Sequence, residues 1–123
     1  MQIYLYANAL LYGIFAIWCT VAFRSTSSAL GYSVLNNSGS SEYLVIYGGL
    51  QAGLACAFVL FARDSRLHPV GVQFAVCLYG PIVIYRAATL IRFAPVSGLT
   101  LATAALEFAL LILGLVLLVV RWP

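Results

Sequence analysis

The chain has 123 residues, of which 64% are hydrophobic and 7% are charged, and its formal net charge is +3. A soluble domain needs about 25% charged residues to cover its surface. This composition therefore excludes a soluble domain and indicates that the apolar surface faces lipid. All of the basic residues are arginines that lie scattered along the chain. They form no basic face, which argues against nucleic-acid binding.

Four apolar stretches are long enough to cross a bilayer, which takes about 20 residues each. We expect spanning helices over about residues 3–23, 41–62, 70–91 and 99–120. Because most of the connections are short, neighbouring spans should run antiparallel. The predicted fold is all-α, a single membrane domain that forms a four-transmembrane-helix bundle.

The first span, 3–23, carries small residues four positions apart, Ala9 with Gly13 and Ala16 with Thr20. Such pairs let helices approach closely in lipid. The N-terminus lacks the basic segment of a signal peptide, so we expect this span to be retained. Residues 25–40 are rich in Ser, Asn and Gly, which predicts an outer loop that could hold a short interfacial helix over 29–35.

The second span, 41–62, should begin with Ser40 or Ser41 as its N-cap. Glu42 then lies in the first turn, where a carboxylate suits the positive end of the helix dipole. Further along this span, small residues recur every four positions at Gly49, Gly53 and Ala57, and such a ridge predicts the closest helix contact in the protein. The small residues expected to pack are Gly48 and the three residues of this ridge.

The third span, 70–91, contains Pro81, which should kink it. The fourth span, 99–120, ends at Arg121–Pro123. Each of these spans carries one internal charge, Arg86 and Glu107 respectively. A charge at the centre of a spanning helix costs about 2.5–3.5 kcal/mol and usually pairs within the bundle, so we predict that these two side chains form an ion pair.

Helical periodicity, and the depth of these residues below the outer membrane surface, place further polar side chains near this pair. Tyr47 and Gln51 share a face of the second span, and Tyr79 shares a face of the third span with Arg86. The predicted site is a polar pocket in the outer half of the membrane. The candidate ligand-binding or ion-pair residues are Glu42, Tyr47, Gln51, Tyr79, Arg86 and Glu107.

Three roles for this cluster remain open. The ion pair could fix the helix register, with Tyr47 and Glu42 completing its hydrogen bonds. The same groups could bind the polar head of a lipid, a quinone or an isoprenoid whose tail lies between helices. They could also form a proton relay or a catalytic site that uses Glu107.

The three cysteines, Cys19, Cys56 and Cys77, each lie inside a predicted span. Buried cysteines behave as small hydrophobic residues. The chain has no CxxC spacing and a single histidine, so we expect no metal site, and no cofactor motif occurs.

The arginines of the loops predict the orientation. Arg63, Arg66 and Arg121 share one side with the chain amine, and Arg24 and Arg92 lie on the other side. Since basic loops favour the cytoplasm, both termini should be cytoplasmic, in a bacterial inner membrane.

An acidic residue followed by Tyr-Gly-Gly, here Glu42 and Tyr47-Gly48-Gly49, precedes Arg86 in the third span and Glu107 in the fourth. This arrangement resembles a bacterial family of four-helix membrane proteins known as domain-of-unknown-function family four-three-four-five. More loosely, it resembles the DoxX-like membrane proteins. The resemblance covers nearly the whole chain and implies the fold and the polar positions, but no activity. The chain departs from the family at Gly80-Pro81 and Tyr85, where members more often carry smaller residues.

We therefore expect a non-catalytic binding or accessory component with a polar intramembrane pocket for a lipid-like or isoprenoid ligand. Its partners would be membrane lipids and a hydrophobic small molecule. One alternative is a subunit or assembly factor of a larger membrane complex, or a homo-oligomer. A second alternative is a membrane enzyme or a proton-coupled transporter that uses Glu107.

Overall fold

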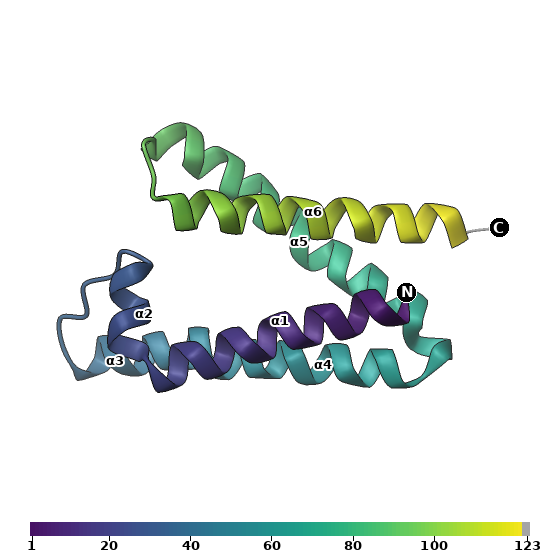
Figure 1. The fold of residues 1–123 in the computed structure, drawn as a ribbon, viewed down its shortest axis with the longest axis horizontal. Coiled ribbons are helices and arrows are strands. Elements are labelled where there is room, and N and C mark those ends of the chain that lie inside the picture. Colours follow the sequence, from purple (N-terminus) through teal and green to yellow (C-terminus); the bar gives the residue numbers. More distant parts are fainter. Residues whose placement is uncertain (122–123) are drawn as a thin grey trace. The chain divides into compact units, whose positions relative to one another are not determined.

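The computed structural model describes residues 1–121, and it is built of helices (Figure 1). No strand occurs among these residues, so the all-α prediction is confirmed. Trp122 and Pro123, part of the expected end of the fourth span, lie outside the described residues. The elements in order are α1 (Gln2–Val21), α2 (Phe23–Ala29), α3 (Asn37–Leu44), the π-helix η1 (Val45–Leu50), α4 (Gln51–Arg63), the 3-10 helix η2 (Ser65–Leu67), α5 (His68–Phe93) and α6 (Gly98–Arg121).

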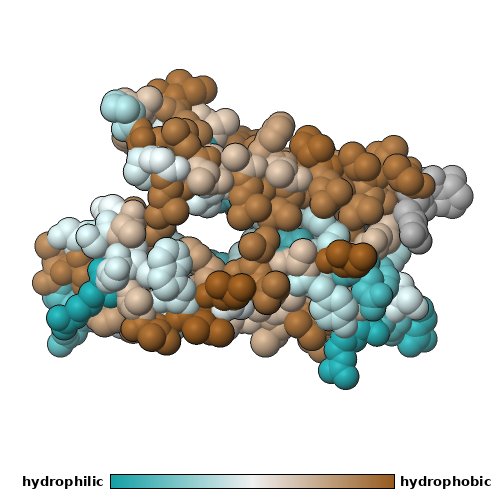
Figure 2. Space-filling model, in the orientation of Figure 1, coloured by the Kyte–Doolittle hydropathy of each residue, from teal (hydrophilic) through white to brown (hydrophobic). Residues whose placement is uncertain are grey.

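Within residues 1–121, four helical stretches are long and apolar enough to cross a membrane. They are Gln2–Val21, Asn37–Arg63, Ser65–Phe93 and Gly98–Val120, and each overlaps one expected span. Figure 2 shows hydrophobic side chains over most of the visible surface. These features are those of a multi-pass membrane protein, whose apolar helix faces contact lipid.

The chain divides into two compact units, and the first is Gln2–Ser65. In this unit α1 packs against α4 and η1. The amide of Gln2 donates to the carbonyl of Ala62 at 3.2 Å. Towards the other end of α1, a Cβ built on Gly48 would lie 2.7 Å from Thr20 Oγ1. The start of α1 thus contacts the end of α4, and the end of α1 contacts η1, so α1 runs antiparallel to the second span.

Of the glycines expected to pack, Gly48 lies against α1, whereas Gly49 and Gly53 of the expected ridge do not. A Cβ built on Gly49 or Gly53 would meet no heavy atom of the described residues within 4 Å. Gly48 and Gly49 lie in the π-helix η1, whose i→i+5 hydrogen bonds change the angle between successive residues, so the four-residue spacing of an α-helix does not carry across them. Further along the span, Ala55 Cβ lies 3.8 Å from a Cβ built on Gly13 of α1, and Ala62 is fully buried.

Residues 25–40, expected to form a loop, are helical at both ends, where 25–29 complete α2 and 37–40 begin α3. Residues 30–36 are not helical, so a short helix over 29–35 does not form. The helix α2 extends to Ala29 and ends in a Schellman motif, in which Gly31 has φ 85° and the N–H of Tyr32 donates to Ser27 O at 2.8 Å. The Thr26 hydroxyl donates to the Ala22 carbonyl at 3.0 Å. Hydroxyl residues that suggested a loop thus donate hydrogen bonds to backbone carbonyls in and beside α2.

The second span begins at Asn37, four residues earlier than expected. Asn36 is its N-cap, since Asn36 Oδ1 accepts the N–H of Gly39 at 2.9 Å. Neither Ser40 nor Ser41 caps this helix, and Glu42 lies beyond its first turn. Asparagine is among the strongest N-cap residues, which explains the earlier start.

The second unit runs from Arg66 to the end of the chain, together with Met1. It is an antiparallel hairpin of α5 and α6 (Figure 1). Pro81 lies inside α5, and the helix continues through it. Ser97 caps α6, because its Oγ accepts the N–H of Thr100 at 3.2 Å.

Candidate functional site

The predicted site residues lie in both units. Glu42, Tyr47 and Gln51 belong to the first unit. The second unit contains the others, Tyr79, Arg86 and Glu107. Each unit brings some of its own site residues together, and the pocket that would combine all six stays a prediction.

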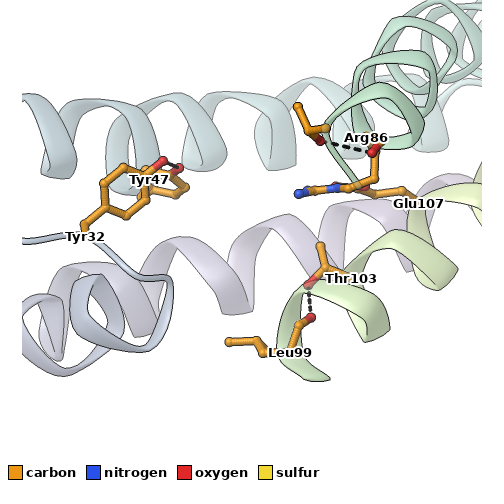
Figure 3. Close-up of polar contacts among 7 residues, drawn as sticks. Tyr32, Tyr47, Arg86, Leu99, Thr103 and Glu107 are labelled. Carbon is orange, nitrogen blue, oxygen red and sulfur yellow. Dashed lines mark hydrogen bonds and ion pairs between the residues drawn. The ribbon is translucent and has the colours of Figure 1, made fainter. Parts of the chain in front are cut away.

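In the second unit, Arg86 of α5 and Glu107 of α6 form the predicted ion pair (Figure 3). Arg86 Nε donates to Glu107 Oε2 at 2.8 Å, and Nη2 donates to Oε1 at 2.8 Å. The exposed fractions of the two side chains are 32% and 15%. Two parallel charge-assisted hydrogen bonds hold the planar guanidinium and the carboxylate in one geometry, so the pair clamps α5 to α6.

The hydroxyls around this pair bond to the backbone of their own helices. Thr89 Oγ1 donates to the carbonyl of Arg86 at 3.0 Å, and Thr103 Oγ1 donates to the carbonyl of Leu99 at 2.9 Å (Figure 3). Tyr79 is buried in α5, seven positions before Arg86. Contact between Tyr79 and a ligand stays a prediction.

In the first unit, Tyr47 belongs to a cluster of three tyrosines. Its hydroxyl lies 2.6 Å from the hydroxyl of Tyr32, and one of the two donates to the other (Figure 3). The ring of Tyr43 stacks on that of Tyr47 with the centroids 4.7 Å apart. Tyr32 meets both rings edge-on, at 6.0 Å from Tyr43 and 5.7 Å from Tyr47. Tyr32 lies in the linker between α2 and α3, residues 30–36, so this linker packs against the start of the second span.

Buried groups of α1 and α2 hold Tyr43 in place. The Tyr43 hydroxyl donates to Thr26 Oγ1 at 3.0 Å and lies 3.6 Å from Cys19 Sγ. Thr26 and Cys19 are both almost fully buried. A buried hydroxyl that keeps its hydrogen bond fixes the direction of its ring, so Tyr43 gives the cluster a rigid base.

The cluster borders an open groove of about 430 Å³, within the range of about 300–1,000 Å³ of small-molecule sites. Glu42 and Tyr47 share this groove, as predicted, whereas Gln51 does not line it. The amide of Gln51 instead donates to the carbonyl of Ile46 at 3.5 Å. The groove is lined by Tyr32, Ser33, Val34, Leu35, Asn36, Gly39, Glu42, Tyr43, Ile46 and Tyr47.

Glu42 is the single charged side chain among the residues that line this groove. It is exposed, and none of the residues in the described part of the chain forms a hydrogen bond or an ion pair with its carboxylate. This differs from Glu107, whose two carboxylate oxygens both accept from Arg86. The groove therefore presents one negative charge together with aromatic faces.

Two of the groove tyrosines, Tyr43 and Tyr32, were not predicted as site residues from the sequence. Tyr43 lies four positions before Tyr47 on the same helical stretch, and such a spacing places two side chains on one face. That signal was available. Tyr32 lies in the linker, and its approach to Tyr47 depends on the turn at Gly31, for which local spacing gives no signal.

Comparison with family models, with curated proteins and with solved structures gives no match for this chain. The family resemblance carried by Glu42, Tyr47-Gly48-Gly49, Arg86 and Glu107 stays a prediction.

Proposed function

We propose that this protein is a non-catalytic binding component of a bacterial inner membrane, which holds the polar head of a lipid-like or isoprenoid molecule. The head would lie in the groove that contains Tyr32, Glu42, Tyr43 and Tyr47. The observation that carries this proposal is the groove itself, with its packed tyrosines and its carboxylate. Pockets with apolar and aromatic walls and few polar groups are typical of ligand sites.

The place of the groove along the chain supports an amphipathic ligand. Glu42, Tyr43 and Tyr47 lie in the early part of the spanning stretch Asn37–Arg63. Tyrosine favours the boundary between membrane and water, where a ligand head would lie. Ile46 lines the groove, is 45% exposed and is followed by further exposed apolar residues such as Leu50. An acyl or isoprenoid tail would lie along these side chains.

The geometry of the ion pair favours a structural role for Glu107 over a proton-carrying one. Both of its oxygens accept hydrogen bonds from the Arg86 guanidinium. Protonation of that carboxylate would weaken both hydrogen bonds, because it would remove the negative charge that makes them charge-assisted. In this proposal the pair holds α5 and α6 together, and the groove of the first unit binds the ligand.

A second candidate function is that of a subunit in a larger membrane complex or a homo-oligomer. The observation in its favour is that Gly49 and Gly53 are exposed, with no heavy atom of residues 1–121 within 4 Å of a Cβ built there. In lipid, small residues let a second helix approach closely. Pull-down from a mild detergent would recover a stoichiometric partner if this function holds, and a lone stable monomer would contradict it.

Native mass spectrometry tests the proposed function. Ile46→Trp should fill the groove with a bulkier side chain, while Val45→Trp places the same side chain on an exposed neighbour outside the groove lining. We expect the wild-type protein and Val45→Trp to retain a lipid-like mass from the membrane, and Ile46→Trp to lose it. Equal retention by both variants, or no retained mass in several detergents, would contradict the proposal.

A further inference from the structure

We infer that the ligand head is cationic, a quaternary ammonium or a protonated amine, held by the Glu42 carboxylate and the ring faces of Tyr32 and Tyr47. This inference rests on the proposed function, because it names the chemistry of the head that the groove would hold. Its first support is the sign of the charge. The groove lining contains one carboxylate and no basic side chain.

The remaining charged side chains of the first unit, Arg24, Arg63 and Asp64, do not line the groove. The guanidinium of Arg24 lies over the ring of Phe23, 5.8 Å from its centroid. An anionic head would therefore meet the Glu42 charge without a compensating cation among the lining residues. A cationic head would gain from that same charge.

The second support is the arrangement of the rings. A cation near the face of a tyrosine is attracted by the negative potential of the ring, and such faces together recognise quaternary ammonium groups. Tyr32 is 51% exposed, so part of its ring is open to a ligand. The planes of Tyr32 and Tyr47 lie 62° apart, so the two rings present differently oriented faces. Tyr43 stacks on one face of the half-buried Tyr47, so Tyr32 is the more open of the two rings.

The rings are also held before a ligand arrives. The hydroxyl pair of Tyr32 and Tyr47 fixes one end of each ring, and the stacked Tyr43 is tied to Thr26. Binding then costs little side-chain freedom, which favours recognition of a small compact head.

One feature of the groove would favour an anionic ligand instead. The N-terminus of α3 borders it, since Asn36 and Gly39 line the groove. A helix N-terminus is equivalent to roughly half a positive charge and acts over the first turn. The Asn36 side chain already accepts the N–H of Gly39, which satisfies one of the donors there. The full negative charge of Glu42 is larger, so the net preference is for a cation.

The test measures binding of three ten-carbon amphiphiles to the full chain in maltoside micelles by titration calorimetry. The probes are decyltrimethylammonium, decyl glucoside and decyl phosphate, and Ile46→Trp gives the binding that does not use the groove. We expect the ammonium probe to bind the wild-type groove about tenfold more tightly than the other two. Glu42→Gln should remove about that factor for the ammonium probe and leave the glucoside unchanged. Asp64→Asn, an acid outside the groove lining, should change neither.

A second variant tests the ring contribution separately. Tyr32→Leu keeps an apolar side chain in the groove but removes an aromatic face. It should weaken ammonium binding about threefold to fivefold relative to glucoside binding. Unchanged glucoside binding by Glu42→Gln and Tyr32→Leu shows that each variant still forms the groove.

The outcomes separate the two proposals. If none of the probes distinguishes the wild-type protein from Ile46→Trp, the proposed function fails and this inference fails with it. If glucoside or phosphate binds the groove as tightly as ammonium, or Glu42→Gln has no effect, the inference is overturned while the proposed function stands. Tetramethylammonium, which has no tail, identifies the source of a cationic head. Competition with the ammonium probe would show that the head binds without a tail, as a free small cation would, and failure to compete would show that the tail is needed, as in a lipid.

Discussion

Glu107 and Glu42 are the same residue type but differ in their hydrogen-bond partners, so the same substitution at the two positions can be compared. Glu107 accepts two hydrogen bonds from Arg86, whereas Glu42 has no ion-pair partner among the described residues. Glu107→Gln should lower the free energy of unfolding by about 2 kcal/mol, the range for charge-assisted hydrogen bonds, because the guanidinium keeps its charge without a counter-ion. Glu42→Gln should stay within about 0.5 kcal/mol of the wild-type protein.

Reversible unfolding in mixed micelles gives both values. The charge-swapped double variant Arg86→Glu with Glu107→Arg should recover part of the lost stability, because the two groups can pair again. Equal stability of Glu107→Gln and the wild-type protein would contradict a clamp between α5 and α6.

Gly48 and Gly49 form a second matched pair. A Cβ on Gly48 would lie 2.7 Å from Thr20 Oγ1, which is itself bonded to the Ala16 carbonyl at 2.7 Å. Gly48→Ala should therefore destabilise the first unit by about 1–3 kcal/mol through overpacking. Gly49→Ala adds its methyl group in open space and should be neutral or stabilising.

Thermal unfolding of the two alanine variants checks this. Adding Thr20→Ala to Gly48→Ala removes the contacting hydroxyl and should restore most of the loss. If Gly49→Ala is the more damaging change, the helix contact lies on the ridge that the sequence predicts and not on the face found in the structure.

At this scale the sequence predicted part of the site. The pairing of Arg86 with Glu107 was predictable, because each charge is costly in lipid and no third charge lies within those two spans. The partner of Tyr47 was not predictable, because Tyr32 reaches it only through the turn at Gly31. Of the glycines predicted to pack, Gly48 does lie against α1, whereas Gly49 and Gly53 do not. The sequence did not predict this difference, because it gave no sign of the π-helix η1.

At the scale of elements, the segment between α1 and α4 differs most from expectation. The four spans match the predicted ranges to within about five residues, because apolar stretches of about 20 residues have the length of a spanning α-helix. The polar residues 25–40 did not predict their own structure. The side chains of Ser, Thr and Asn36 can form hydrogen bonds in a loop or at a helix end, so the sequence alone favours neither. In the structure, the segment is held by the tertiary contacts of Tyr43 and Tyr32.

The N-cap of α3 gives a prediction at this scale. Asn36→Ala removes the side-chain acceptor for the Gly39 N–H and should cost about 1 kcal/mol. Asn37→Ala changes the first residue of the helix, which is not the cap, and should cost less. Amide hydrogen exchange of the first turn of α3 checks this, with faster exchange expected for Asn36→Ala alone. Equal exchange in both variants would contradict the assigned cap.

At the scale of the whole molecule, orientation is the open prediction. With both termini cytoplasmic, the linker residue Ser33 would lie outside and Ser65 inside. In a variant whose three cysteines are replaced by alanine, an impermeant maleimide should label Ser33→Cys in intact cells. Ser65→Cys should be labelled only after permeabilisation. The reverse pattern would place both termini outside.

The central claim is that the groove between the linker and the start of the second span is the ligand site, with the Arg86–Glu107 pair holding α5 to α6. The most direct measurement is an electron-density map from crystals grown in native membrane lipid. We expect elongated density whose head lies against Tyr32, Glu42 and Tyr47. Ligand density beside Arg86 with the groove empty would contradict it.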